Sequence, residues 1–309
     1  MKRYDVIILG AGPAGLTAAL YTARARLSTL VVSGFMPGGQ ISQTYQVENY
    51  PGFPEGITGP DLTSKFKAQA EKFGAKFVEY EASAVDFDSH PYNITVNSEK
   101  FESHSVIIAT GMTHKKLRIP GEDKLMGRGV FVCATCDAIL YEDLKVAVIG
   151  GGNSAIQEAL DLSKYAEEVT ILHRRDEFKA APYLVNLAKE NPRIKFVMNC
   201  EAIEIIGDKK VESLKIRVKP TGEISSINVE GILVAIGWDP NTSIFRGQLE
   251  LDTENYILSK GVFTEKPGVF VCGDLIDRLY RQVVTSCSSG CIAALETEKY
   301  LVNRGHVPL

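Results

Sequence analysis

The sequence is short of positive charge. Its 34 lysine and arginine residues are outnumbered by 38 aspartate and glutamate residues, which gives a formal net charge of −4. Nucleic acids and anionic membrane surfaces favour proteins with basic patches. The composition therefore gives no reason to expect either as a partner, and small molecules or other proteins are left.

Long apolar runs are also missing. No run of roughly 18 apolar residues, the length of a membrane-spanning helix, is free of glycine or polar breaks. Lys2 and Arg3, followed by the apolar run 6–9, imitate the start of a signal peptide. Asp5 and the glycines that follow interrupt that pattern, so we expect neither a membrane span nor a signal peptide.

Cysteine is scarce as well, with six cysteines in 309 residues. Six are too few for a secreted fold that depends on disulfides. The low count favours a reducing cytoplasm, where a Cys-x-x-Cys pair can cycle between disulfide and dithiol.

Two of the cysteines form such a pair, in the stretch Cys133-Ala134-Thr135-Cys136-Asp137. Two intervening residues let both sulfurs lie on the first turn of a helix. There a disulfide can close, and the positive helix end stabilises a thiolate. The alternative is half of a zinc site completed by Cys287 and Cys291. These two lie in an apolar, helix-like stretch, however, so a role as buried, small apolar side chains explains them better, and Cys200 and Cys272 likewise. We expect no metal.

The chain length predicts two domains, because single cores stop growing at about 250 to 300 residues. The composition is 45% hydrophobic and 23% charged, with 27 glycines, which is typical of a soluble α/β protein.

A glycine motif follows the first predicted strand. Residues 5–9 form a buried strand, Gly10-Ala11-Gly12-Pro13-Ala14-Gly15 comes next, and a helix is predicted over 16–25. The first glycine allows a tight turn, the second lets the backbone approach a pyrophosphate, and the third lets the helix pack on the strand. The next strand, 28–33, ends in Ser33, where an acid for a ribose is usual. The loop Gly38-Gly39-Gln40 is then the better source of further backbone contacts.

The same pattern is repeated later in the chain. Gly150, Gly152 and Ala155 follow a second strand as Gly10, Gly12 and Gly15 follow the first. Two such units predict two nucleotide sites. The strand 168–173 runs into Arg174 and Arg175, whose forked donors suit a 2′-phosphate, which favours NADP(H) over NAD(H). A solvated charge run is the alternative.

The sequence of the C-terminal part predicts that the chain returns to the first domain. A strand over 231–236 is followed by 237–241, a turn by composition, where the chain crosses back. A strand over 268–272 ends in Gly273-Asp274, which places a carboxylate where open α/β sheets bind ligands; a turn-capping Asp is the alternative. Residues 283–301 are expected to form a helix.

Taken together, these motifs resemble those of the low-molecular-weight, bacterial-type thioredoxin reductases over essentially the whole chain. The matching motifs are, in order, GAGPAG, GGQ with VENYPG, ATG, CATCD, GGGNSA, HRRDEFKA, GVFVCGD and YRQ. The resemblance implies an α/β fold of two Rossmann-like nucleotide-binding domains. An NADPH domain, 113–245, is inserted into an FAD domain made of 1–112 and 246–309. The CxxC lies just ahead of the second nucleotide unit, unlike its position in glutathione-reductase-like enzymes.

The resemblance also implies which residues bind the cofactors. Those implied for FAD are Gly10, Gly12, Pro13, Ala14, Gly15, Gly38, Gly39, Gln40, Asn49, Asp274, Arg281 and Gln282. Those implied for NADPH are Gly150, Gly152, Ser154, His173, Arg174, Arg175 and Lys179. The chain departs from the family at Ala138, where Gly is usual, at Gln157, where Glu is common, and at Lys179, which replaces Arg.

By resemblance, NADPH gives a hydride to FAD, the reduced flavin opens the Cys133–Cys136 disulfide, and the dithiol reduces a protein disulfide. Cys136 would face the flavin and Cys133 would attack the substrate. Asp137 is the expected general acid, because opening a disulfide produces thiolates that need protons; a helix-capping Asp is the alternative. This relay requires the inserted domain to rotate about its two connections.

The implied partner is thioredoxin or a thioredoxin-like protein, and a homodimer is expected. Docking is implied near Arg128, Ile139 and Leu140, for which a partly buried helix face is the alternative. A flavin-dependent disulfide oxidase and a non-enzymatic redox sensor are rival functions. The HRRDEFKA stretch favours a pyridine nucleotide donor over the oxidase.

Overall fold

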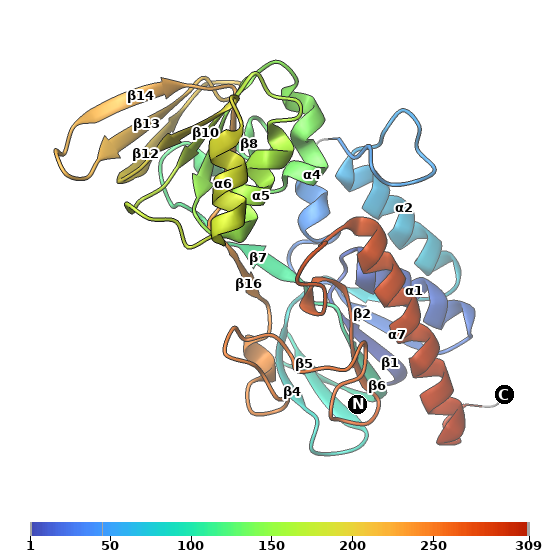
Figure 1. The fold of residues 1–309 in the computed structure, drawn as a ribbon. Coiled ribbons are helices and arrows are strands. Elements are labelled where there is room, and N and C mark those ends of the chain that lie inside the picture. Colours follow the sequence, from blue (N-terminus) through green and yellow to red (C-terminus); the bar gives the residue numbers. More distant parts are fainter. Residues whose placement is uncertain (1, 45, 308–309) are drawn as a thin grey trace. The chain divides into compact units, whose positions relative to one another are not determined.

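The computed structural model describes residues 2–44 and 46–307, and it divides into two compact units. Unit 1 contains Met1–Thr113 and Asp239–Leu309, and unit 2 contains His114–Trp238 (Figure 1). Unit 2 is thus inserted into the sequence of unit 1.

Unit 1 is built on a seven-stranded sheet with the order β3-β2-β1-β6-β5-β4, in which β17 also pairs with β6. Its strands are β1 (Lys2–Leu9), β2 (Thr29–Val32), β3 (Lys76–Val78), β4 (Ala82–Asp86), β5 (Tyr92–Val96), β6 (Glu99–Ile108) and β17 (Val269–Val271). Its helices are α1 (Pro13–Arg24), α2 (Gly59–Lys72) and α7 (Val283–Asn303), with short 3₁₀ turns η1 (Gln40–Gln43), η3 (Ser243–Phe245) and η4 (Gly273–Leu275).

The first strand shows why this sheet is covered on both faces. Val6, Ile7, Ile8 and Leu9 are all buried, since side chains alternate between the two faces of a strand. Val6 and Ile8 belong to one apolar cluster, together with residues of α1 and α7. Ile7 and Leu9 belong to a second cluster, which includes Phe245 and Val271. A continuous apolar run is what a strand between two cores requires.

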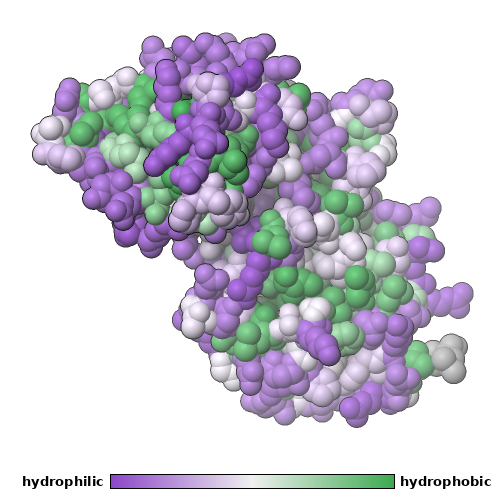
Figure 2. Space-filling model, in the orientation of Figure 1, coloured by the Kyte–Doolittle hydropathy of each residue, from purple (hydrophilic) through white to green (hydrophobic). Residues whose placement is uncertain are grey.

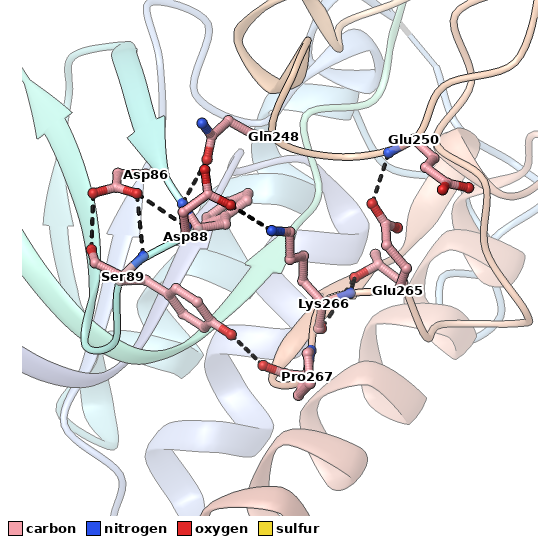
Figure 3. A network of polar contacts seen from close by, with 11 residues as sticks. Asp86, Asp88, Ser89, Gln248, Glu250, Glu265, Lys266 and Pro267 are labelled. Carbon is pink, nitrogen blue, oxygen red and sulfur yellow. Dashed lines mark hydrogen bonds and ion pairs between the residues drawn. The ribbon is translucent and has the colours of Figure 1, made fainter.

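The C-terminal part of unit 1 is also tied to the first part by polar contacts (Figure 3). The Phe87 amide donates to the side-chain oxygen of Gln248 at 2.7 Å, and Lys266 pairs with Asp88 at 2.6 Å. The Tyr92 hydroxyl donates to the carbonyl oxygen of Pro267. These contacts fasten the segment that leads into β17 to the β4–β5 turn.

Unit 2 contains a five-stranded parallel sheet and a three-stranded antiparallel one. The first has the order β11-β10-β9-β15-β8, from β8 (Val130–Phe131), β9 (Lys145–Gly150), β10 (Glu168–Leu172), β11 (Ile194–Val197) and β15 (Gly231–Ala235). The second contains β12 (Cys200–Ile206), β13 (Ser213–Val218) and β14 (Ile224–Asn228). The helices are α3 (Glu122–Leu125), α4 (Ala134–Asp137), α5 (Asn153–Leu162) and α6 (Pro182–Glu190), and a 3₁₀ turn, η2 (Ala138–Tyr141), follows α4.

The predicted turn over 237–241 is wrong. Residues Trp238–Pro240 form strand β16, which pairs with β7 (Met112–His114) in a two-stranded sheet. Pro240 is the last residue of β16, and a proline is tolerated in an edge strand where its position needs no N–H for the ladder. The local Asp-Pro composition indicated a turn, whereas the partner strand comes from a distant part of the chain.

The return to unit 1 comes earlier than the predicted boundary at 245/246, because residues after Trp238 already belong to unit 1. The side-chain amide of Asn241 donates to the Thr110 backbone carbonyl at 2.9 Å, and the Thr110 hydroxyl donates to the Asn241 backbone carbonyl at 2.7 Å. Phe245 is fully buried and stacks on Phe87 at 6.3 Å between ring centroids.

Within the described ranges, no helix is both long enough and apolar enough to cross a membrane. On the face drawn in Figure 2, apolar residues gather in separate patches among hydrophilic ones.

Candidate redox centre and nucleotide sites

The two cysteines of the CxxC stretch are bonded to each other. Cys133 and Cys136 form a disulfide with their Cα atoms 5.4 Å apart. Cys133 is the N-cap of α4, and its sulfur accepts a hydrogen bond from the Cys136 amide at 3.2 Å. Helix α4 has only four residues and continues as η2, so the predicted helix-dipole stabilisation of a thiolate is limited to a single turn. The amide hydrogen bond is the more specific stabilisation of the Cys133 sulfur.

Asp137 is the titratable group next to the disulfide. Burial raises the pKa of its carboxyl to about 7, because the charged form loses solvation. The helix-capping alternative is not supported, since the Asp137 side chain makes no capping hydrogen bond to η2. A carboxyl with this pKa holds a proton at neutral pH about half of the time, which suits a general acid.

Glu158 is a residue that the sequence reasoning missed. Its carboxylate, on α5, accepts a hydrogen bond from the Ala134 amide at 3.1 Å, at the start of α4. Its neighbour Gln157 is exposed and reaches only Asp161, at 3.4 Å. Residues 155, 159 and 162 are buried on α5, and position 158 lies on the same side at helical spacing. That periodicity is the signal that could have identified Glu158.

The glycine turn of unit 1 has little room for side chains. Gly10 has a φ of +108°, and a Cβ there would lie 2.2 Å from the Ala109 carbonyl oxygen. A Cβ on Gly15 would lie 2.0 Å from the Gly10 carbonyl oxygen, so the absence of a side chain lets α1 pack on the turn. Helix α1 begins at Pro13 with Gly12 as its N-cap, and no side chain caps it. Its first amides therefore remain available to an anion.

The loop at Gly38 and Gly39 lies directly against this turn. The Gly38 amide donates to the Ala11 carbonyl at 3.0 Å, and a Cβ on Gly39 would lie 3.1 Å from the Gly12 Cα. The Gln40 side chain donates to the Met112 carbonyl at 3.2 Å. Two glycine segments thus form one backbone-lined cradle, which fits a dinucleotide.

The C-terminal residues reach the same end of the sheet. A Cβ on Gly273 would lie 3.0 Å from the Ala14 Cβ, which places Asp274 beside the start of α1. Asp274 accepts from the Ser286 hydroxyl at 3.0 Å, and burial raises the pKa of its carboxyl. This hydrogen bond to α7 gives Asp274 a structural partner as well as a place in the cradle.

Three further predicted residues border this region. The side-chain amide of Asn49 donates to the Gln282 side-chain oxygen at 3.3 Å. Arg281 donates to the Tyr256 hydroxyl at 3.0 Å, and that hydroxyl in turn donates to the Met112 sulfur at 3.5 Å. All of the residues predicted for FAD therefore lie in unit 1, on segments that contact one another.

Unit 2 repeats the uncapped helix start. Helix α5 has Gly152 as its N-cap without a side-chain cap, and a Cβ on Gly152 would meet nothing within 4 Å. The segment after β10 folds back over this turn, where the Lys179 amide donates to the Gly151 carbonyl at 2.8 Å. This arrangement leaves open space and free amide positions at the start of α5.

His173 holds the segment after β10 in place through two backbone carbonyl groups. Its Nδ1 lies 3.1 Å from the Gly150 carbonyl oxygen and its Nε2 lies 3.0 Å from the Glu177 carbonyl oxygen. Burial lowers its pKa, so the ring is mostly neutral and donates to one carbonyl at a time. Since both nitrogens face the backbone, His173 is better suited to position the loop than to contact a ligand directly.

The cations of this segment are exposed. Arg174, Arg175 and Lys179 all lie at the surface, as does Ser154 at the start of α5. Within residues 2–44 and 46–307, neither arginine forms a salt bridge with a carboxylate. Their guanidinium groups are available to a phosphate.

Residues 4–290 match the model of the family described as pyridine nucleotide-disulphide oxidoreductase. The chain belongs to this family. The thioredoxin reductase of Streptomyces coelicolor is 46% identical over 301 residues, 96% of this chain and 94% of the relative. A bifunctional thioredoxin reductase/thioredoxin of Mycobacterium leprae is 43% identical over 301 residues, 96% of this chain and 66% of the relative. A thioredoxin reductase structure from Streptococcus pyogenes has a TM-score of 0.93 at 34% identity, covering 97% of this chain and 99% of the other.

These similarities confirm the family resemblance and the α/β fold class predicted from the motifs. In this pyridine nucleotide-disulphide oxidoreductase, the residues predicted to dock a protein lie at the surface of unit 2. Ile139 and Leu140, in η2, are 44% and 47% exposed, and Arg128 is exposed too. Exposures of 44% and 47% fit the docking prediction, and they equally fit its alternative, a partly buried helix face.

The other cysteines of the oxidoreductase are unbonded. Cys200 and Cys272 are buried, and burial raises the pKa of both thiols. Cys287 and Cys291 lie on α7 and are only partly buried, less so than predicted. Raised thiol pKa values make the two buried cysteines poor nucleophiles.

Proposed function

We propose that this protein is an NADPH-dependent thioredoxin-disulfide reductase that holds FAD in unit 1 and NADPH in unit 2. The observation that carries the proposal is the redox disulfide Cys133–Cys136 with Asp137, whose pKa is raised to about 7, in the same unit as a nucleotide turn flanked by unpaired arginines. The names of the relatives from Streptomyces and Streptococcus point to the same activity.

The residues of unit 1 fit FAD. The turn at Gly10–Gly15 and the loop Gly38–Gln40 would hold the pyrophosphate with backbone amides, and Asp274 lies beside them. When bound, FAD would supply the redox chemistry that links hydride transfer from NADPH to two-electron reduction of the disulfide. Ser33 does not replace the usual ribose acid, because its hydroxyl donates to the Val78 carbonyl at 3.0 Å.

The residues of unit 2 fit NADPH. The start of α5 at Gly152 would receive the pyrophosphate, and Arg174, Arg175 and Lys179 would neutralise the 2′-phosphate. His173 would set the position of that segment through its two carbonyl contacts.

The chemistry of the CxxC then follows from its own atoms. Two electrons and two protons convert the Cys133–Cys136 disulfide into a dithiol, and Asp137 supplies one of those protons. The Cys133 thiolate attacks the partner's disulfide and forms a mixed disulfide. Cys136 then attacks the Cys133 sulfur, which releases the reduced partner and restores the original bond.

The partner would be thioredoxin or a thioredoxin-like protein. The relative from Mycobacterium leprae carries both names in one chain, which supports that choice. Arg128, Ile139 and Leu140 would provide a basic group and an apolar surface close to the disulfide in sequence. A homodimer in the cytoplasm completes the proposal.

Reduction of the Cys133–Cys136 disulfide by the flavin and exchange of the resulting dithiol with the partner protein need different surroundings. We infer that unit 2 rotates about its two connections, the segments around β7 and β16, because one position of the CxxC cannot serve both steps. A flavin-dependent oxidase would need no exposed arginine pair, and a redox sensor would need no turnover.

The proposal is tested by following dithiol production when the purified, FAD-loaded protein is mixed with NADPH and oxidised thioredoxin. We expect many equivalents of dithiol per protein. The variants Cys133→Ser and Cys136→Ser should lose this activity, yet their flavin should still bleach with NADPH. A single equivalent of oxidised NADPH would indicate a sensor, and oxygen consumption in place of dithiol would indicate an oxidase.

A further inference from the structure

Three of the five histidines of the chain meet at one place in unit 1. His90 precedes β5, His104 lies in β6, and His306 follows α7. One ring nitrogen from each lies within 4.8 Å of the others. None of the three belongs to the glycine cradle or to the CxxC region, so the redox function leaves the cluster unexplained.

The rings are packed closely. The centroids of His104 and His306 are 4.1 Å apart, and His90 lies 5.5 Å from His104 and 5.4 Å from His306. His90 is exposed, whereas His104 is partly buried in its strand. One side of the cluster is therefore open to solvent.

The hydrogen bonds of the cluster leave nitrogens without protein partners. The Nε2 of His90 lies 3.2 Å from the carbonyl oxygen of His104, to which it can donate. In that tautomer, the Nδ1 of His90 keeps its lone pair. The Nδ1 of His104 is buried and has no hydrogen-bond partner in the described part of the chain. Histidines that bind metals commonly donate their other ring N–H to a backbone carbonyl, as the Nε2 of His90 can here.

We propose that His90, His104 and His306 bind one divalent cation of the late first-row transition metals, with Zn²⁺, Ni²⁺ or Cu²⁺ as the chemical class. Imidazole is a preferred ligand of these ions, and three histidines with an open fourth position form a common coordination set. The exposed side at His90 leaves that fourth position to water.

The geometry requires only a local adjustment. Metal–nitrogen bonds of about 2.0 to 2.1 Å at tetrahedral angles place ligand nitrogens roughly 3.4 Å apart. Nitrogens that lie up to 4.8 Å apart must therefore move closer by as much as about 1.4 Å. His306 can supply this movement, since it lies beyond the C-cap Arg304 of α7 and follows Gly305, which has a φ of +70°.

The charges around the cluster are mixed. Asp5 acts favourably on His104 and His306, whereas Arg3 and Arg304 act against a cation. Arg3 is paired with Glu102 at 2.8 Å, which reduces its effect. Asp5 accepts from the Ser28 amide and hydroxyl, both at 2.7 Å, so it remains outside the ligand set and contributes charge only.

A bound ion would fasten the end of α7 to β6 and to the turn before β5. It binds the folded state alone, because the three histidines are far apart in the unfolded chain. Binding must therefore raise the unfolding temperature in proportion to the logarithm of the free metal concentration.

The test uses tag-free, FAD-loaded protein that has been stripped with a chelator and kept oxidised, so that Cys133 and Cys136 cannot bind metal. Zn²⁺ is titrated against a chromophoric chelator, and Co²⁺ serves as a spectroscopic probe. The variants His90→Gln and His306→Gln remove one ligand each at exposed or terminal positions. His114→Gln, which removes a buried histidine outside the cluster, is the control for loss of an imidazole, and alkylated protein controls for the free thiols.

We expect one equivalent of Zn²⁺, a rise in unfolding temperature, and a Co²⁺ spectrum without thiolate charge-transfer bands. His90→Gln and His306→Gln should each weaken Zn²⁺ binding at least about tenfold, the loss seen even for an outer-shell partner of a metal site. The control variant and alkylation should leave binding unchanged. Binding that survives both ligand variants, binding abolished by alkylation, or no saturable binding at all would each overturn the proposal.

Discussion

The carboxyl of Asp137 changes its protonation within the physiological pH range, because burial penalises its charged form. Its protonated form is the one that can donate to a nascent thiolate. With a pKa of about 7, that form falls to roughly one tenth at pH 8. The disulfide step should therefore slow as the pH rises above 7.

We predict that Asp137→Asn lowers thioredoxin turnover by about tenfold to a thousandfold, within the range attributed to a general acid. The fall in rate above pH 7 should disappear in this variant, and both can be measured in a pH series of kcat. The raised pKa also affects stability. At a pH below the pKa of Asp137 in the unfolded chain, the protonated carboxyl makes its full contribution to the folded state, and this contribution is lost as the pH rises through 7. Stability of Asp137→Asn should thus depend less on pH between 4 and 7. An unchanged pH profile would contradict the assignment.

Glu158 acts on the same centre through the backbone. Its carboxylate accepts from the Ala134 amide, which would otherwise be a partly buried donor without a partner. Glu158→Ala should lower the unfolding free energy by about 1 to 3 kcal/mol and slow thioredoxin reduction, because the start of α4 loses its support. Glu158→Gln keeps an acceptor oxygen and should recover most of the loss.

The adjacent Gln157→Ala is the matched control, since Gln157 is exposed and contacts only Asp161. Chemical denaturation and steady-state kinetics of the three variants provide the measurement. Equal effects of Glu158→Ala and Gln157→Ala would show that the hydrogen bond to Ala134 has no role.

Single residues were predictable where the requirement is local. Residue type and spacing alone identify the glycines at 10, 12 and 15 and the cysteines at 133 and 136, and both are visible in the sequence. The Glu158–Ala134 hydrogen bond joins residues of two different elements, and it depends on how α5 packs beside α4. The histidine cluster is less predictable still, because β6 and the end of α7 are far apart in sequence and come together only in the folded unit.

At the level of elements, the segment after β10 is the one that we propose to determine the choice between NADPH and NADH. We predict that replacing Arg174 and Arg175 together with Ala erases the preference for NADPH over NADH, because each charged hydrogen bond to the 2′-phosphate contributes roughly 1.5 to 3 kcal/mol. Arg217→Ala, at an exposed position on β13, is the control. The measurement is the ratio of kcat/KM for the two nucleotides, and a double variant with the parent's ratio would disprove the role of these arginines.

The 3₁₀ turn η2 is the element that we propose to dock thioredoxin. Ile139→Ser with Leu140→Ser should raise KM for thioredoxin while leaving reduction of a small disulfide dye unchanged, because both side chains are almost half exposed. Leu187→Ser, on α6, is a matched control because this residue is 51% exposed in the same unit. Loss of folding and of both activities would instead indicate a core role.

Helices and strands were predicted correctly where the pattern within one segment of the chain is sufficient to identify them. The strands before both glycine turns and the helix over 283–301 were predicted, the helix ending slightly later in the structure. The segment 237–241 was not, because its turn-like composition was outweighed by pairing with β7. The sheet of β12, β13 and β14 also had no prediction, since its strands are partly exposed and lack a strong apolar run.

On the scale of the whole molecule, unit 2 has the properties of an independent domain. It contains two apolar clusters of its own, and its ends are joined, since the Lys115 amide donates to the Gly237 carbonyl at 2.9 Å. We predict that the excised segment 114–238 folds cooperatively and binds NADPH more tightly than NADH. Thermal unfolding and nucleotide titration provide the measurement, with the Arg174 and Arg175 double variant as the binding control. A fragment without a cooperative transition would contradict this prediction.

Unit 1 is interrupted, and this has a consequence during translation. Once residue 238 has left the ribosome, unit 2 is complete, whereas β6 still lacks β17 and α1 still lacks α7. Ala293 and Leu301 of α7 belong to the same apolar cluster as Val6 and Ile8, so that cluster stays open until α7 has emerged. A nascent chain that stalls in this interval presents a finished disulfide domain beside an exposed half-core. Transiently exposed apolar surface of this kind makes a nascent chain prone to aggregation and dependent on chaperones.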